Sequence, residues 1–157
     1  MRLFIAIDIN SGEIEKIKKS FEVDGVKVDR SKHLTLKFLG EVENNKLSKI
    51  VEALDKIKFK EFEIRTTNLG GFPSLNKPRV IWVGVEGEEL VELRNKIDKV
   101  LPEFKEDREL KPHLTIARVK FAKESLKELV KNTKVKEEKF KVREFRLFES
   151  RFDGRRF

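Results

Sequence analysis

The sequence contains no cysteine, no tyrosine and no glutamine among its 157 residues. Without cysteine, the chain has no disulfide bridge, no thiolate metal ligand and no thiol nucleophile. Histidine is also scarce: His33 and His113 are the only two, and two histidines without cysteine make a poor zinc site. The G-x-x-x-x-G-K-S/T motif of P-loop nucleotide sites is absent as well. We therefore expect neither a metal nor another cofactor.

Long hydrophobic runs are missing too. No apolar segment approaches the roughly 18 residues that a membrane helix requires. The N-terminal segment MRLFIAID predicts a strand that reaches an acid at Asp8, not a signal peptide. We expect a cytoplasmic protein without a membrane partner. Because no long apolar face demands a second subunit, we also expect a monomer.

Charged residues are abundant: they make up 41% of the chain, with 36 Lys and Arg against 28 Asp and Glu, a net charge of +8. Such a charge content is found in disordered chains, but the apolar residues here are periodic and include 13 Phe, which indicates a packed core. A basic domain suits a polyanionic partner such as RNA. A Lys- and Glu-rich surface is equally typical of heat-tolerant proteins.

The apolar periodicity predicts an alternation of strands and helices. Strands are expected at 2–9, 33–39, 61–66, 79–85, 113–120 and within 134–149, and helices at 11–21, 45–57, 88–101 and 123–131. A loop rich in Gly and Pro at 70–78 separates two halves of similar plan. We expect an α+β fold: one bilobal domain over 1–157, with two pseudo-symmetric β-α-β-rich lobes, roughly 1–68 and 79–149, that flank a central cleft and can intertwine.

Each predicted half contains one histidine, and both histidines are followed by Leu-Thr and an aliphatic residue. In a strand, residues i and i+2 point to the same face. His33 and Thr35 therefore share one face, as do His113 and Thr115, while the intervening leucines point into the core. If the halves pack about a pseudo-twofold axis, two imidazoles and two hydroxyls converge on one cleft.

Two imidazoles facing one site suit phosphoryl transfer. One neutral imidazole removes a proton from the attacking oxygen, and the other, protonated, donates to the leaving oxygen. Threonine hydroxyls would donate to the nonbridging phosphate oxygens, where negative charge grows in the transition state. This chemistry requires no metal ion.

The paired His-x-Thr motifs resemble those of the 2H phosphoesterase superfamily. Within it, the chain is similar to the bacterial and archaeal RNA 2′,3′-cyclic phosphodiesterases, also called 2′-5′ RNA ligases (LigT/ThpR-type). The similarity covers nearly the whole length, with four matching blocks: RLFIAID at 2–8, HLTLKFLGE at 33–41, GGFPSLNKPRVIWVGV at 70–85 and KPHLTIARVK at 111–120. The resemblance implies antiparallel sheets on either side of the cleft.

The resemblance also implies site residues and an activity. His33 and His113 would be catalytic, and Thr35, Thr115 and Arg118 would bind the substrate phosphate, with no metal. The implied reaction opens a 2′,3′-cyclic phosphate at an RNA end, tRNA halves included, to a 2′-phosphate. A reversible, ATP-independent 2′-5′ ligation would use the same site. The family often has a C-terminal block with a tyrosine, where this chain offers only phenylalanines: Phe148, Phe152 and Phe157.

Four neighbouring residues are harder to place. Strict alternation from His113 puts Arg118 on the buried face, so that a bulge or the strand end would have to redirect it. The same alternation predicts that Phe38 lies in the core and that Lys37 shares the open face of His33, where it would meet RNA phosphate or solvent. Trp82, within a predicted strand, is expected in the core.

Two other functions remain open at this point. One is a different 2H activity, such as hydrolysis of ADP-ribose cyclic phosphate or trimming of oligonucleotide 3′ ends. The other is a non-catalytic RNA-binding module that uses a basic face. A binding module needs no pair of proton carriers, so the intact motifs favour an enzyme.

Overall fold

The structure is a computed structural model that describes residues 1–150. The arginines of the C-terminal basic segment (Arg151, Arg155 and Arg156) and the aromatic candidates Phe152 and Phe157 lie outside the described residues. In chain order, the elements are β1 (Arg2–Asp8), α1 (Gly12–Ser20), β2 (Val26–Val28), β3 (His33–Glu41), η1 (Asn44–Lys46), α2 (Leu47–Asp55), β4 (Phe62–Phe72), β5 (Val80–Glu86), α3 (Glu88–Val100), η2 (Pro102–Phe104), β6 (His113–Val119), α4 (Glu124–Asn132), β7 (Lys139–Val142) and β8 (Arg146–Ser150).

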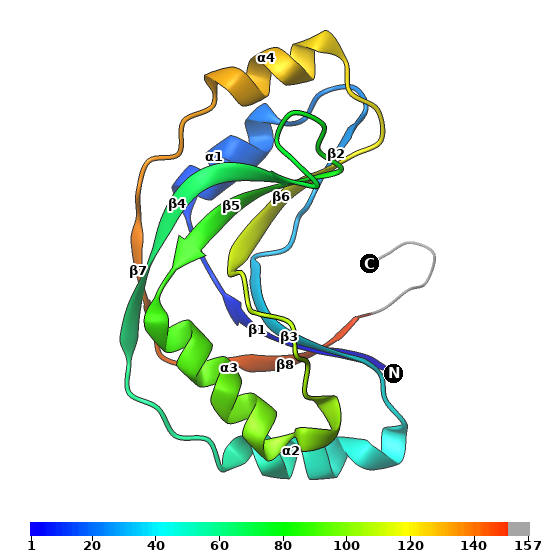
Figure 1. Cartoon of the computed structure of the whole chain (residues 1–157), viewed down its shortest axis with the longest axis vertical. Helices are drawn as coiled ribbons and strands as arrows, with labels where there is room; N and C mark the ends of the chain where they lie inside the picture. Colours follow the sequence, from blue (N-terminus) through cyan, green and yellow to red (C-terminus); the bar gives the residue numbers. More distant parts are fainter. Residues whose placement is uncertain (151–157) are drawn as a thin grey trace.

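All strands join in one antiparallel arrangement with the order β7-β4-β5-β6-β3-β1-β8, and β2 pairs with β6 beside this path. One lobe contains β7, β4, β5, β6 and β2, and the other contains β3, β1 and β8 (Figure 1). The lobes meet at β3 and β6, where Leu34 and Leu114 are Cα partners. The predicted α+β fold with antiparallel sheets is confirmed.

The two halves of the sequence exchange elements between the lobes. Helix α1 packs against β6, whereas α3 packs against β3 and α2. Strand β4, from the first half, pairs with β5 and β7 from the second. In Figure 1, α1 and α4 lie at one end of the molecule and α2 and α3 at the other. Each lobe therefore takes strands and helices from both halves of the chain.

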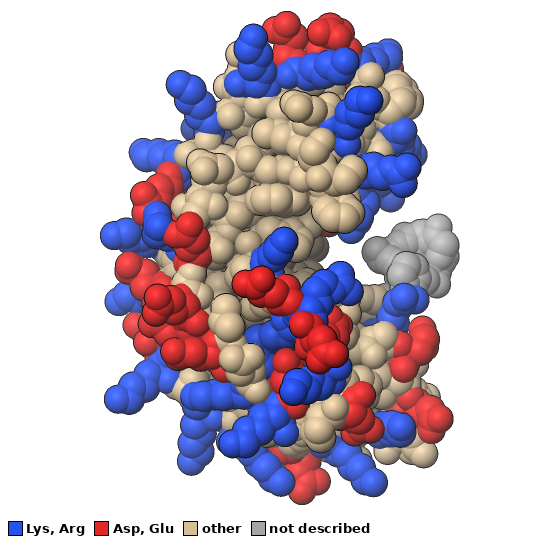
Figure 2. All heavy atoms as spheres, viewed as in Figure 1, with Lys and Arg blue, Asp and Glu red and all other residues tan. Residues whose placement is uncertain are grey.

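One face of the strands at the junction is buried, and the other is open. Leu34, Leu114 and Ile116 belong to the hydrophobic core, which the helices cover because their apolar stripes have the helical period. Figure 2 shows the outline hollowed on the right-hand side, between the two lobes. No helix among residues 1–150 is long and apolar enough to cross a membrane.

Two strands differ from the prediction. Strand β2 was missed because three residues are too few to show an alternation. Strand β4 continues through Gly70 and Gly71 to Phe72, in a segment predicted to be a loop. Its last three residues pair with Val80–Trp82, so tertiary pairing overrides the low strand propensity of glycine.

Candidate active site

The two His-x-Thr motifs lie side by side at the junction of the lobes. Because β3 and β6 run antiparallel with Leu34 opposite Leu114, one step along the register places His33 opposite Thr115 and Thr35 opposite His113. None of these four is buried. The predicted convergence of two imidazoles and two hydroxyls, hereafter the quartet, is thus a property of the strand register.

A β-bulge follows each motif at the same position. In β3, Thr35 pairs with Ala6 but Lys37 pairs with Ile5, so Leu36 is the extra residue. Strand β6 has the same irregularity, because Thr115 pairs with Trp82 and Ala117 with Ile81, leaving Ile116 as the extra residue. Two consecutive residues then point into the core on each strand, and the alternation is inverted beyond them.

The bulges decide the positions of the residues that alternation misplaced. Arg118 is exposed on the face of His113 and Thr115, as the redirecting bulge required. Phe38, the equivalent residue of β3, is 65% exposed on the open face, so the prediction that it lies in the core is wrong. Lys37 is buried instead of open, so the prediction that it shares the face of His33 is also wrong.

Lys37 is held in the core by an ion-pair network. Its ammonium donates to Asp98 Oδ1 at 2.6 Å, and its side chain is fully buried. Asp98 also lies 3.5 Å from Arg94 Nε, and Arg94 reaches Glu106 at 3.7 Å. A buried ammonium requires such partners. The network ties the bulge of β3 to helix α3 and thereby fixes where the strand changes face.

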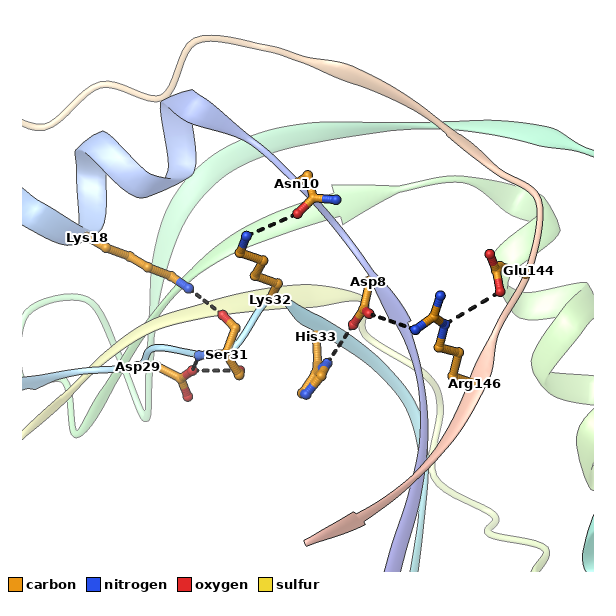
Figure 3. Close-up of polar contacts among 9 residues, drawn as sticks. All are labelled: Asp8, Asn10, Lys18, Asp29, Ser31, Lys32, His33, Glu144 and Arg146. Carbon is orange, nitrogen blue, oxygen red and sulfur yellow. Dashed lines mark hydrogen bonds and ion pairs between the residues drawn. The ribbon is translucent and has the colours of Figure 1, made fainter. Parts of the chain in front are cut away.

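His33 is oriented by a carboxylate. Asp8 is its Cα partner on β1, and His33 Nδ1 donates to Asp8 Oδ1 at 2.8 Å (Figure 3). The other Asp8 oxygen lies 4.0 Å from Arg146, which in turn pairs with Glu144 at 3.5 Å. A carboxylate that accepts from Nδ1 fixes the tautomer and leaves Nε2 for chemistry.

The chain that leads to His33 is also anchored (Figure 3). Lys18 on α1 donates to the Ser31 carbonyl at 2.5 Å, and the Ser31 amide donates to Asp29 Oδ1 at 2.8 Å. Burial lowers the pKa of the Lys18 ammonium below 10.5, against the attraction of Asp29 and Glu15. These contacts hold the turn at residues 29–31, just before His33, the first residue of β3.

His113 is oriented differently. Its Nδ1 lies 2.8 Å from the Lys111 carbonyl oxygen, an acceptor that also leaves Nε2 free. Its Cα partner on β5 is Gly84, the position that corresponds to Asp8 in the other half. A Cβ on Gly84 would lie 2.4 Å from Thr67 Oγ1, so a side chain there would require Thr67 to move. The two histidines of the quartet are therefore oriented by different partners, the Asp8 carboxylate for His33 and the Lys111 carbonyl for His113.

Aromatic rings surround the two imidazoles unequally. Phe4 and Phe148 stack with centroids 5.2 Å apart, and His33 lies 5.3 Å from the first and 4.3 Å from the second. Phe38 extends this cluster, 6.2 Å from Phe4. The His113 side has one aromatic neighbour among the described residues, the Trp82 indole at 6.0 Å.

Trp82 is only half-buried, so its predicted core position is wrong. The indole lies over Gly70, where a Cβ would come within 2.2 Å of the ring. Because Gly70 has no side chain, the indole can lie against its backbone beside the site. Since Trp82 pairs with Thr115, it borders the quartet directly.

Sequence reasoning missed Asp8 as a site residue. Its only signal was an acid at the end of an apolar strand, which is common at strand ends. The pairing of β1 with β3 brings Asp8 opposite His33, and this pairing was not predicted. No group of three His, Cys, Asp or Glu side chains that could hold a metal ion occurs within residues 1–150.

The fold and the paired motifs define a phosphoesterase of the two-histidine class. The comparison with protein families agrees: residues 7–82 and 83–156 each match the family described as LigT like Phosphoesterase. The chain belongs to this family. The double match also shows that the internal repeat is real at the level of sequence.

Named relatives and solved structures extend this result. The chain is 39% identical to an RNA 2′,3′-cyclic phosphodiesterase of Archaeoglobus fulgidus, over 96% of this chain and 91% of the relative. It is 41% identical to an enzyme of the same name from Methanocaldococcus jannaschii, over 96% and 87%. The crystal structure of E. coli LigT with 3′-AMP superposes with a TM-score of 0.75 at 27% identity, covering 96% of this chain and 88% of LigT.

Proposed function

We propose that the protein is an RNA 2′,3′-cyclic phosphodiesterase that produces 2′-phosphomonoesters, with His33 and His113 as catalytic residues. The observation that carries the proposal is the quartet: two histidines with free Nε2 atoms and two threonine hydroxyls on one open face. The relatives that share 39% and 41% of their residues bear this enzyme's name.

In the proposed reaction, a water oxygen attacks the phosphorus of the cyclic phosphate and the P–O3′ bond breaks. One imidazole takes the proton of the attacking water at Nε2, and the other gives its Nε2 proton to the departing 3′ oxygen. The Thr35 and Thr115 hydroxyls donate to the nonbridging oxygens as their charge increases. Each His ends in the protonation state of the other, so proton exchange with solvent resets the site.

Arg118 supplies the positive charge of the proposed phosphate site. It lies on the quartet face beyond Thr115, and the guanidinium offers five donors in a planar fork that matches a phosphate. On the other side, the rings of Phe4, Phe38 and Phe148 offer a surface on which a nucleobase can stack. The proposed site therefore has a phosphate-binding side at Arg118 and a base-stacking side at the phenylalanine rings.

The same site supports the same transfer with another nucleophile. When an RNA 5′-hydroxyl replaces water, the same attack and departure give a 2′,5′ phosphodiester without ATP. We include this ligase activity in the proposal, together with action as a monomer in the cytoplasm on RNA ends such as those of tRNA halves. The two imidazoles and two hydroxyls supply the acid, base and anion-stabilising groups, so the proposed reaction needs no metal.

The test uses a short RNA with a 2′,3′-cyclic phosphate end, incubated with EDTA and without nucleotide. We expect the parent protein to give a 2′-phosphate, and His33→Ala and His113→Ala each to lose at least about 10²-fold in kcat. A matched control replaces Lys16, an exposed residue of α1, by Met. A strict need for a divalent metal, a 3′-phosphate product, or RNA binding without turnover would contradict the proposal.

A further inference from the structure

A second cation lies beside Arg118. Lys27 on β2 is the Cα partner of Arg118 on β6, and both side chains are exposed. Residues directly opposite in an antiparallel pair point to the same face. Since the bulge of β6 turns Arg118 toward the face of His113 and Thr115, Lys27 shares the face of the quartet.

This arrangement lacks the compensation seen at several other cations of the sheet. Like charges directly opposite on neighbouring strands are destabilising. Strand cations such as Arg65, Lys141 and Arg146 all have acidic partners. Within residues 1–150, Lys27 and Arg118 have no hydrogen-bond or ion-pair partner for their side chains. Two adjacent unneutralised cations on the quartet face are what an anionic ligand requires.

Building on the proposed function, we infer that Lys27 binds the phosphate on the 5′ side of the reacting nucleotide, while Arg118 binds the reacting phosphate itself. Opposite Cα atoms are about 4.5–5.5 Å apart, a spacing that lets two long cationic side chains follow two successive phosphates of one strand. Hydrolysis involves a single RNA strand, so the phosphate adjacent to the reacting one lies on its 5′ side. Lys27 then favours RNA ends over free cyclic nucleotides.

The surface charge agrees with an RNA strand that runs from the quartet past β2. In Figure 2, the right-hand edge of the upper lobe, near β2 and the connection between β6 and α4, is mostly blue, whereas blue and red side chains mix on the other lobe and red ones also lie over α4. A strand that leaves the quartet past β2 therefore meets positive charge. No acidic side chain separates Lys27 from Arg118, since they are direct cross-strand neighbours.

The test compares two substrates that differ by one phosphate: a nucleoside 2′,3′-cyclic phosphate and the same compound with an added 5′-phosphate. We expect the parent to have the lower KM for the 5′-phosphorylated substrate. Lys27→Met raises that KM roughly three- to fivefold, as suits an exposed ion pair, and leaves kcat and the KM of the other substrate unchanged. The dependence of that KM on salt concentration weakens in the variant, because the lost ion pair was screened by salt. Lys27→Arg keeps the preference, and Lys16→Met is the matched control.

The outcomes separate the two levels of the proposal. If the parent hydrolyses both substrates and Lys27→Met changes neither KM, or both equally, the 5′-phosphate site is refuted. If the parent hydrolyses neither substrate and also leaves the cyclic-phosphate RNA end intact, the proposed function fails. The Lys27 site is then tested by calorimetric binding of the same two compounds to parent and variant, and equal affinities for both compounds refute it. Melting temperatures of parent and variants check that the fold is unchanged.

Discussion

The contact between Asp8 and His33 gives the sharpest prediction. Asp8→Asn keeps the size of the side chain but removes its charge, and an amide NH₂ that turns toward Nδ1 forces the wrong imidazole tautomer. A hydrogen bond to a charged group contributes about 1.5–3 kcal/mol. The Asp8 side chain is 36% exposed, so solvent screening brings the expected effect just below this range, to about 1.4 kcal/mol or tenfold in kcat. KM stays unchanged, because Asp8 positions His33 without touching substrate.

Two measurements on the same variant check this reasoning. Steady-state hydrolysis of a cyclic-phosphate RNA end gives kcat and KM, and ¹⁵N NMR of the imidazole reports which His33 nitrogen bears the proton. The matched control is Glu144→Gln, which removes a carboxylate from the same chain of contacts one step further, at Arg146. If Asp8→Asn retains the parent kcat, or if kcat falls while the His33 tautomer is unchanged, Asp8 is not the positioning residue.

Three further predictions concern the supports of the site. Lys37→Met leaves Asp98, whose side chain is 12% exposed, with one cationic partner, and we expect the free energy of unfolding in urea to fall by about 2–3 kcal/mol, less than for a fully unpaired charge; an unchanged midpoint would contradict the network. Gly70→Ala places a methyl group within 2.2 Å of the Trp82 ring, so the emission of this single tryptophan shifts and kcat falls; an unshifted spectrum would show that the indole is not held there. Burial lowers the pKa of Lys18, so the folded state holds this proton less tightly than the unfolded chain. Stability therefore rises as the pH increases from the lowered pKa toward 10.5. The difference in unfolding free energy between the parent and Lys18→Met between pH 8 and 10.5 measures this rise, and a difference that stays constant or falls over this range would refute it.

Much of the site follows from the sequence because it depends on strand periodicity. The placement of His33 with Thr35, and of His113 with Thr115, needs only the rule that residues i and i+2 share a face. The bulges were beyond reach, because a bulge arises from the pairing of two strands and leaves no mark in the period of one. For that reason Phe38 and Lys37 were placed on the wrong faces, while Arg118 needed the bulge to reach the right one.

Asp8 and Lys27 were missed for a related reason. Each acquires its position through a partner that lies far away in the sequence: Asp8 through His33, and Lys27 through Arg118. A single acid or a single lysine in a charge-rich chain has no distinguishing feature on its own. Only the register between strands reveals that one faces an imidazole and the other a guanidinium.

The two bulges explain how one repeated motif builds an asymmetric site. Both halves place a histidine, a threonine and the residue five positions after the histidine on the open face. That fifth position is Phe38 in one half and Arg118 in the other, and the position opposite the histidine is Asp8 in one and Gly84 in the other. A symmetric site would offer equal surroundings to both sides of a phosphate, yet a nucleotide end has a base on one side and a charged backbone on the other. The shared bulge preserves the quartet, and the residues around it differ where the substrate differs.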